Sequence, residues 1–226
     1  MSRDVYAPPP APMQRLSRRA LLGLGRGPDY ERATALVRAQ EHEPLARALA
    51  PVEAVLRDFA PGRVLELPLT AWRDLDLQAL PHRDGAFDGV VSAFGAALAP
   101  RPRRMARELV RVVRPGGVVA IAAWVPKGLP GRLDELLDRP DGVRAPSDWG
   151  RREVMTARLE PLLEGLELRT RTVQLVFPDA ETFYAALGAP THERPALDRL
   201  LASCNNAVDR VEIDARYLLA TGRRPA

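Results

Sequence analysis

Three short, continuous runs of apolar residues constrain the fold of this chain more than any other feature. They are the segments 63–67 (RVLEL), 88–94 (DGVVSAF) and 118–124 (VVAIAAW). Runs without polar alternation are typical of strands covered on both faces, as in parallel sheets. Between the last two runs, Met105, Leu109 and Val113 repeat at helical spacing. Strand, helix and strand form a βαβ unit, so the sequence predicts an α/β fold with a parallel-centred sheet.

The second half of the chain predicts more helices and two more strands. Residues 153–163, 181–188 and 196–208 have helical spacing, whereas residues 166–177 alternate apolar and polar side chains. Such alternation is typical of a strand with one wet face. A last apolar strand follows at residues 215–222. We expect these two strands to finish the sheet as an antiparallel pair.

The N-terminal region has a different composition. Residues 1–15 include APPPAPM, which cannot sustain a helix or a strand. Residues 16–25 carry paired arginines before an apolar stretch, as export signals do, but charges interrupt it after about six residues, which is short for a signal segment. Residues 29–60 then show helical spacing. We interpret residues 16–25 as a docking helix, predict a cytoplasmic protein, and divide the chain into an arm, 1–43, and one domain, 44–226.

Composition argues against several classes of function. Apolar residues make up 46% of the 226 residues, which predicts a folded chain, and the formal net charge is only +4. The single cysteine, Cys204, excludes an internal disulfide, and the three histidines lack metal-ligand spacing, so we predict no metal site. No apolar run approaches the roughly 20 residues that cross a bilayer, so we predict no membrane partner.

Six arginines gather on and just beyond the predicted central helix. Phosphate binding is one interpretation. The other, which we favour, is that they form the wet face of a helix whose buried face carries Met105 and Leu109. Because aromatic residues for base stacking do not alternate with the arginines, we predict no nucleic-acid partner. The six are Arg101, Arg103, Arg104, Arg107, Arg111 and Arg114.

Residues 79–124 carry a family resemblance. They run from a Leu-Pro and an Asp-Gly-Ala-Phe-Asp, through a strand and a helix, to an Arg-Pro-Gly-Gly turn and a further strand. This block resembles the centre of class I S-adenosylmethionine-dependent methyltransferases of the small-molecule type (type 11). The resemblance implies a Rossmann-like fold with the cofactor above the carboxyl ends of the strands, where open α/β sheets bind ligands.

The first part of the domain departs from this family. There the first strand runs into a glycine-rich turn, and a second strand ends in a carboxylate that binds the ribose hydroxyls. Here no glycine occurs between Gly62 and Gly85, and only nine residues separate Glu66 from Asp76. Since a βαβ unit takes about 30 residues or more, this unit is missing. The predicted fold is therefore reduced in its N-terminal half.

The resemblance also implies a set of cofactor-binding residues. Glu66 matches the acidic residue near the methionine end of S-adenosylmethionine. Asp76 matches the residue that meets the adenine amino group, and Leu77 the residue whose backbone N–H reaches the ring. The residues under the sulfonium are Ser92, Ala93 and Phe94. Each of the six also has a structural interpretation, as a strand end, a turn or helix cap, or a core residue.

His82 is the catalytic candidate. It lies in LPHRDG, a loop that we expect near the mouth of the pocket. An imidazole that titrates near neutral pH can serve as a general base. The alternative interpretation is an exposed loop histidine.

Two classes of function follow from these observations. An active enzyme would move a methyl group from S-adenosylmethionine to an oxygen, nitrogen or carbon of a small molecule, mainly by aligning the reactants. A weakly active or non-catalytic relative would keep the fold for binding, as a homo-oligomer or with an intact methyltransferase paralogue. The missing unit favours the second class, and the well-kept central block favours the first. A gene product without a present role is a third interpretation.

The missing unit also predicts association. It leaves Val64, Leu65 and Leu67 in a strand without its usual neighbours on one side. Unpaired backbone groups and apolar side chains in water invite pairing with another chain. We therefore expect this strand to be exposed unless a partner subunit or another segment of the chain covers it.

Overall fold

The computed structural model describes residues 44, 47–67, 76–99, 101–136, 146–187 and 194–226. The predictions for the arm, 1–43, lie outside these residues. The described chain divides into two compact units. The first comprises Pro51–Val173 and Ala215–Ala226, and the second includes Gln174–Asp214.

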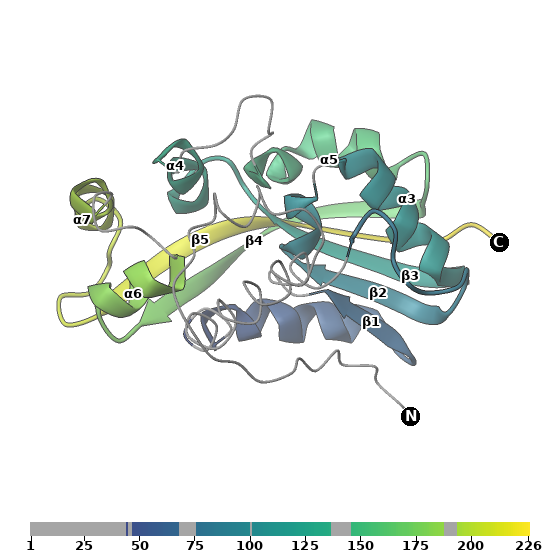
Figure 1. The fold of residues 1–226 in the computed structure, drawn as a ribbon, viewed down its shortest axis with the longest axis horizontal. Helices are drawn as coiled ribbons and strands as arrows, with labels where there is room; N and C mark the ends of the chain where they lie inside the picture. Colours follow the sequence, from purple (N-terminus) through teal and green to yellow (C-terminus); the bar gives the residue numbers. More distant parts are fainter. Residues whose placement is uncertain (1–43, 45–46, 68–75, 100, 137–145, 188–193) are drawn as a thin grey trace, which may run out of the picture. The chain divides into compact units, whose positions relative to one another are not determined.

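One five-stranded sheet has the order β1-β2-β3-β5-β4 (Figure 1). Strand β1 (Val64–Leu67) pairs in parallel with β2 (Phe87–Ala93), and β2 pairs in parallel with β3 (Val113–Trp124). Strand β5 (Val211–Arg223) runs antiparallel to β3 and is followed in the sheet by β4 (Glu164–Phe177). The predicted α/β class, with a mostly parallel sheet and a reduced N-terminal half, is confirmed.

The helices match the predicted segments with shifted ends. Helix α5 stops at Leu159 rather than residue 163, because Pro161 has no N–H to continue the helical ladder. Two 3-10 turns, η2 (Gly95–Leu98) and η3 (Pro146–Gly150), and helix α4 were not predicted. The α-helices are residues 47–59, α3 (Pro102–Val112), α4 (Leu129–Leu136), α5 (Arg152–Leu159), α6 (Ala180–Leu187) and α7 (Arg194–Ala202).

Helix α3 is the centre of the core in the first unit. Its apolar stripe packs with one face of the parallel strands and with α5, which lies on the same side of the sheet (Figure 1). The side chains of Met105 and Leu109 are fully buried there beside Leu65, Leu67 and others. The helix of residues 47–59 lies on the opposite face (Figure 1), where Arg57 bonds to Glu66.

Strand β3 begins earlier than predicted. Val113, which the helical spacing assigned to α3, is the first residue of β3 and pairs with Phe87. Gly89 then pairs with Val118, so Arg114–Gly117 bulge out of the ladder. Glycines permit this bulge. Gly116 has φ +74°, and a Cβ on Gly117 would lie 2.5 Å from the Asp88 carbonyl oxygen.

Of the two alternatives for the apolar side chains of β1, exposure or cover by another segment, the structure shows cover by the chain itself. Val64, Leu65 and Leu67 are only 4%, 3% and 1% exposed. Leu65 and Leu67 pack into the α3 side of the core, whereas Val64 lies on the other face, which Ala60 approaches at Gly89. The two faces of β1 are thus covered. In the described part of the chain, β1 has one strand neighbour, β2, so its outer edge is the end of the sheet.

Arg111 fixes the segment that leads into β2. From the last turn of α3 it donates hydrogen bonds to the carbonyl oxygens of Leu80 and His82, at 3.1 and 2.8 Å, and to the Asp84 carboxylate at 2.7 Å. It also pairs with Glu108 at 2.8–2.9 Å. The neighbouring carboxylates raise the pKa of Arg111, so its charge is permanent. One half-buried cation therefore holds both ends of residues 80–84.

The second unit has its own polar cluster. The Tyr184 hydroxyl of α6 donates to the Asp198 carboxylate of α7, and Arg194 lies over the Tyr184 ring, 5.4 Å from its centroid. Glu181 accepts both terminal nitrogens of Arg194, at 2.7 and 2.8 Å. Burial, followed by the Asp198 carboxylate, raises the pKa of Tyr184 to about 12. These contacts tie α6 to α7.

We expect Arg111→Met to lower the free energy of unfolding by about 2–4 kcal/mol, because it removes the ion-pair partner of the half-buried Glu108 carboxylate and the donor to two carbonyls. Urea denaturation measures the change. Arg107→Met is the matched control, one turn earlier on the exposed side of α3. It should change the free energy of unfolding by no more than about 0.5 kcal/mol. Equal effects of the two substitutions would contradict this account of Arg111.

A second prediction concerns pH. Hydrogen bonding to Arg111 lowers the pKa of Glu108, and the Leu80 N–H adds to this effect. A carboxylate with a lowered folded-state pKa stabilises the fold above its unfolded pKa, and this stability is lost as pH falls through the folded value. Glu108→Gln should therefore destabilise the protein at pH about 7 and progressively less below pH about 4.5. Urea melts across this range test this, with the exposed Glu160→Gln as control; a deficit that does not depend on pH would contradict it.

Candidate functional site

The carboxyl ends of β1, β2 and β3 meet at one edge of the sheet. The strands are parallel, and their register sets Leu67 beside Ser92 and Ala93 beside Ala122. Open α/β sheets bind their ligands at this edge. The residues that follow β1, 68–75, lie outside the described part of the chain.

Ser92 and Ala93 close β2 with buried side chains. The Ser92 hydroxyl is fully buried and accepts the Ala96 N–H at 2.9 Å, which joins the strand end to η2. Ala93 is 3% exposed. Both side chains are therefore structural in the described contacts, and what this part of the chain offers a ligand is its backbone.

Phe94 has a strained backbone. It is the one non-glycine residue of the described chain with positive φ, at +66°, a conformation that costs an aromatic residue about 1–3 kcal/mol. Its ring stacks on Trp124 at the end of β3, with centroids 3.7 Å apart and planes 10° apart, and meets Tyr217 of β5 edge-on at 6.0 Å. These ring contacts compensate for the strain. Sparsely populated backbone conformations of this kind cluster at functional sites.

Trp124 and Tyr217 were missed by the sequence analysis. Each lies within a predicted strand, and their meeting depends on the antiparallel register in which Trp124 pairs with Tyr217. The available signal was an aromatic residue at the end of an otherwise aliphatic strand, VVAIAAW. Burial raises the pKa of Tyr217.

Glu66 is bound by a neighbouring arginine. Its carboxylate accepts Arg57 Nε at 3.0 and 3.1 Å and pairs with Arg57 Nη2 at 3.0 Å. Its side chain lies on the face of the sheet that the helix of residues 47–59 covers, opposite Leu67. This pair also raises the pKa of Arg57. The observed contacts give Glu66 a structural role at the strand end.

Asp76 and Leu77 form a turn beside the core. Asp76 Oδ1 accepts the Gln78 backbone N–H at 3.1 Å and the Gln78 side-chain amide at 3.3 Å. Leu77 is buried in the same cluster as Leu67 and Ala96, so this turn lies near the carboxyl edge. Gln78 Oε1 is buried without a hydrogen-bond donor in the described part of the chain. Its capacity to accept a hydrogen bond is therefore unused in the described contacts.

His82 lies at the opposite edge of the sheet. Its ring meets Phe87, the first residue of β2, edge-on at 4.9 Å, and its carbonyl accepts Arg111 from the last turn of α3. Residues 76–84 run along α3 from its first turns, where Arg104 donates to the Gln78 carbonyl, to its end at Arg111. The structure therefore brings Asp76 and Leu77 toward Ser92 and Phe94 and separates His82 from them. A catalytic role for His82 stays a prediction.

Two of the six arginines form structural ion pairs. Arg111 is bound as described above, and Arg114 pairs with Asp88 at 2.6 Å. That arginine, together with the Arg63 N–H at 2.7 Å, lowers the pKa of Asp88. Arg101, Arg103, Arg104 and Arg107 follow the first turns of α3 on its outer surface.

Among the described residues, no group of three or more histidine, cysteine, aspartate or glutamate side chains gathers in a way that holds a metal ion. None of the described helices is long and apolar enough to cross a membrane.

Residues 38–121 match the methyltransferase domain family. Over these residues the chain is similar to that family. The match includes β1, β2, α3 and most of β3, which are the elements that build the candidate site. The family resemblance of the central block is thereby confirmed.

Parts of the chain are also similar to curated proteins. An uncharacterised protein of Mycobacterium tuberculosis is 36% identical over 102 residues, which are 42% of this chain and 37% of the relative. A phosphatidylethanolamine N-methyltransferase of Cereibacter sphaeroides is 36% identical over 80 residues, 35% of each chain. The matches thus span little more than a third of the length of these relatives.

A solved structure has a similar fold. The crystal structure of a Bacillus halodurans protein assigned as a methyltransferase superposes with a TM-score of 0.50 at 17% identity. The superposition covers 79% of this chain and 99% of that one. At this identity the likeness shows the fold, which agrees with the Rossmann-like arrangement of the described strands.

We expect Ser92→Ala to lower the free energy of unfolding by about 1–3 kcal/mol, because it leaves the Ala96 N–H buried without an acceptor. Thermal or urea unfolding measures this change. Ser203→Ala is the control. That hydroxyl donates to the Leu200 carbonyl from a half-buried position that water can reach, and its loss should cost less than about 1 kcal/mol. If Ser92→Ala is as mild as the control, the hydroxyl does not anchor the end of β2.

Proposed function

We propose that this methyltransferase-family protein has a degenerate S-adenosylmethionine site, is weakly active or non-catalytic, and acts by binding a partner. One observation carries the proposal: β1 is the outermost strand of the described sheet. In the family, further strands lie outside β1, and the end of the nearest one supplies the carboxylate for the ribose. Nine residues between Glu66 and Asp76 are too few for such a unit, which takes about 30 or more.

The glycine-rich turn is missing as well. Such a turn lets backbone N–H groups approach the ligand, because a Cβ would hold them away. This chain has no glycine between Gly62 and Gly85. Glu66, the remaining acidic residue of β1, is already paired with Arg57. The cofactor would thus lose the ribose carboxylate and the turn, and would compete with Arg57 for Glu66.

Two fragments of the cofactor site are retained. Asp76 and the orphaned Gln78 Oε1 are acceptors suited to the adenine amino group, with Leu77 beside them in the core. The end of β2, Ser92–Phe94, matches the position under the sulfonium. These fragments support residual binding at the adenine and sulfonium ends of the ligand, without contacts to the ribose between them.

An active enzyme is the second candidate. The strained Phe94 and its stack on Trp124 favour it, because such strain is typical of functional sites. The acceptor would be an oxygen, nitrogen or carbon of a small molecule, and the relative from Cereibacter sphaeroides is an N-methyltransferase. His82 would act as a base only if it moved to the other edge of the sheet.

The partner would be a second copy of this chain or an intact methyltransferase paralogue. Support comes from the outer edge of β1, which has no strand neighbour among the described residues. Backbone N–H and C=O groups at such an edge can pair with a strand of another chain. We also propose that the protein is cytoplasmic.

Calorimetry with S-adenosylhomocysteine tests the cofactor site. A hydrogen bond to a charged group contributes about 1.5–3 kcal/mol, so losing the ribose carboxylate and the turn amides should weaken binding by several powers of ten relative to an intact family member. We expect no saturation at low micromolar ligand and no methyl transfer from labelled S-adenosylmethionine above background.

The variants Asp76→Ala and Asp84→Ala sharpen this test. Both remove a carboxylate, but Asp84 lies at the other edge of the sheet, where it pairs with Arg111. Low-micromolar binding that Asp76→Ala abolishes and Asp84→Ala preserves would show that the cofactor site is intact, and the active-enzyme candidate would replace our proposal.

A further inference from the structure

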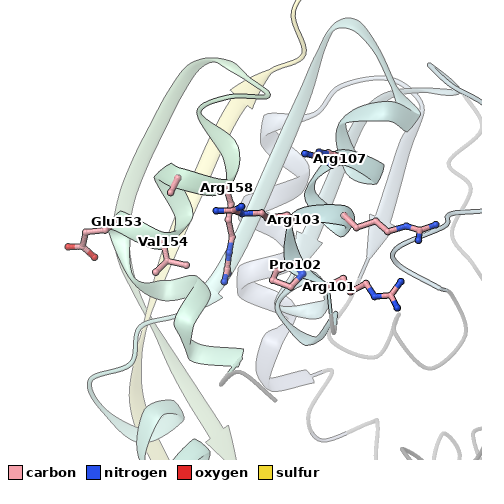
Figure 2. A pocket seen from close by; sticks show the side chains of 9 residues that line it. Arg101, Pro102, Arg103, Arg107, Glu153, Val154 and Arg158 are labelled. Atoms are coloured by element: carbon pink, nitrogen blue, oxygen red, sulfur yellow. The ribbon is translucent and has the colours of Figure 1, made fainter. Parts of the chain in front are cut away.

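A basic groove lies between helices α3 and α5, lined by residues outside the candidate cofactor site. Its volume is about 750 Å³, and it opens to solvent. Figure 2 shows arginines from both helices along it. The charged lining residues are Arg101, Arg103, Arg104 and Arg107 from α3 and its start, with Glu153 and Arg158 from α5.

The charges of this groove are not balanced. The lining includes five arginines and one carboxylate, and Glu153 points away from the arginines on the far side of α5 (Figure 2). Elsewhere on α3, Arg111 is neutralised by Glu108 and Asp84. Within the described part of the chain, by contrast, Arg103 and Arg107 form no ion pair. Among the described residues, these two guanidinium groups of the groove therefore have no counter-charge.

The dipole of α3 adds to the positive charge of the groove. The first turn of the helix contains Arg103 and Arg104 and no acidic residue. The start of a helix carries partial positive charge and favours acidic side chains, so arginines there oppose the helix dipole. Arg103 and Arg107 also stand four residues apart on one face, where like charges repel. Local rules broken in this way, without a gain in folding, are typical of functional sites.

Arg158 forms the wall of the groove opposite Arg103. It is 8% exposed, and its guanidinium lies over the Trp149 ring, 4.4 Å from the centroid. Stacking on an aromatic face holds the guanidinium plane in one orientation. Figure 2 shows Arg103 reaching from α3 toward this residue. A held guanidinium on one wall and two solvent-facing ones on the other are suited to clamp an anion.

We propose that the groove between α3 and α5 binds a phosphate group, held by Arg103 and Arg107 on one side and Arg158 on the other. A guanidinium group can donate two hydrogen bonds to the oxygens of one phosphate, and a dianion would neutralise the excess of positive charge. The remaining lining residues, Pro102, Val154 and Ala157, include no aromatic ring for stacking a base. Recognition is therefore centred on the phosphate, whether a soluble ester or a lipid headgroup carries it.

Isothermal titration with inorganic pyrophosphate at low ionic strength tests the site. We expect saturable binding of one anion per chain. The double variant Arg103→Gln/Arg107→Gln should weaken it about tenfold or more. The matched control is Arg169→Gln/Arg171→Gln, which removes the same charge from exposed positions of β4 and should stay within about twofold of the parent. Circular dichroism verifies that both variants are folded.

A flotation assay separates the two sources of phosphate. If the groove binds a lipid headgroup, vesicles of phosphatidylcholine with phosphatidic acid should capture the protein, and pyrophosphate should compete with the vesicles for it. They should fail to capture it if the ligand is soluble; both results fit the proposal when pyrophosphate binds in the groove.

Absence of binding in both assays, or equal weakening by the two double variants, would overturn the proposal. So would tighter binding of a polyglutamate peptide than of pyrophosphate, since the groove would then serve an acidic protein. None of these outcomes depends on S-adenosylmethionine, so the groove and the cofactor site are tested separately.

Discussion

Burial of one apolar stripe of α3 against the parallel strands is the packing interaction on which the rest of the first unit depends. Met105, Leu109 and Val112 are completely enclosed, and this fixes the rotation of the helix about its axis. Once that rotation is set, every polar residue of α3 has a defined direction. Glu108 and Arg111 reach the segment that leads into β2, whereas Arg103 and Arg107 point into the groove beside α5.

The same packing explains how β1 can be the outermost strand of the described sheet. Leu65 and Leu67 bury their side chains in the α3 core, and the helix of residues 47–59 covers the other face of β1. Apolar burial of this kind contributes about 1.5–3 kcal/mol per large side chain, which does not require a further strand. The fold therefore tolerates the short link between Glu66 and Asp76, on which the degenerate cofactor site that we propose depends.

The residues of the candidate site fall into two groups. Asp76, Leu77 and Phe94 lie toward the carboxyl edge, as the family resemblance implies, but Glu66 is paired with an arginine and His82 lies at the other edge. The error in the expected position of His82 has a specific cause. Residues 76–84 run the length of α3 before β2 begins, and their hydrogen bonds to Arg104 and Arg111 set that path. No periodicity in the sequence records those bonds.

Sequence alone determined the strands, the buried face of α3 and the length of the link after β1, because apolar periodicity and covalent chain length are local properties. It did not determine where the bulge places Val113, since that depends on the pairing of β3 with β2. Nor did it separate the six arginines, because an ion pair depends on distance in space. Asp88 and Arg114 meet across 26 residues, and Arg158 comes to face Arg103 from a different helix. Only the tertiary structure decided which arginines are neutralised and which leave positive charge in a groove, and that is where it goes beyond the family resemblance.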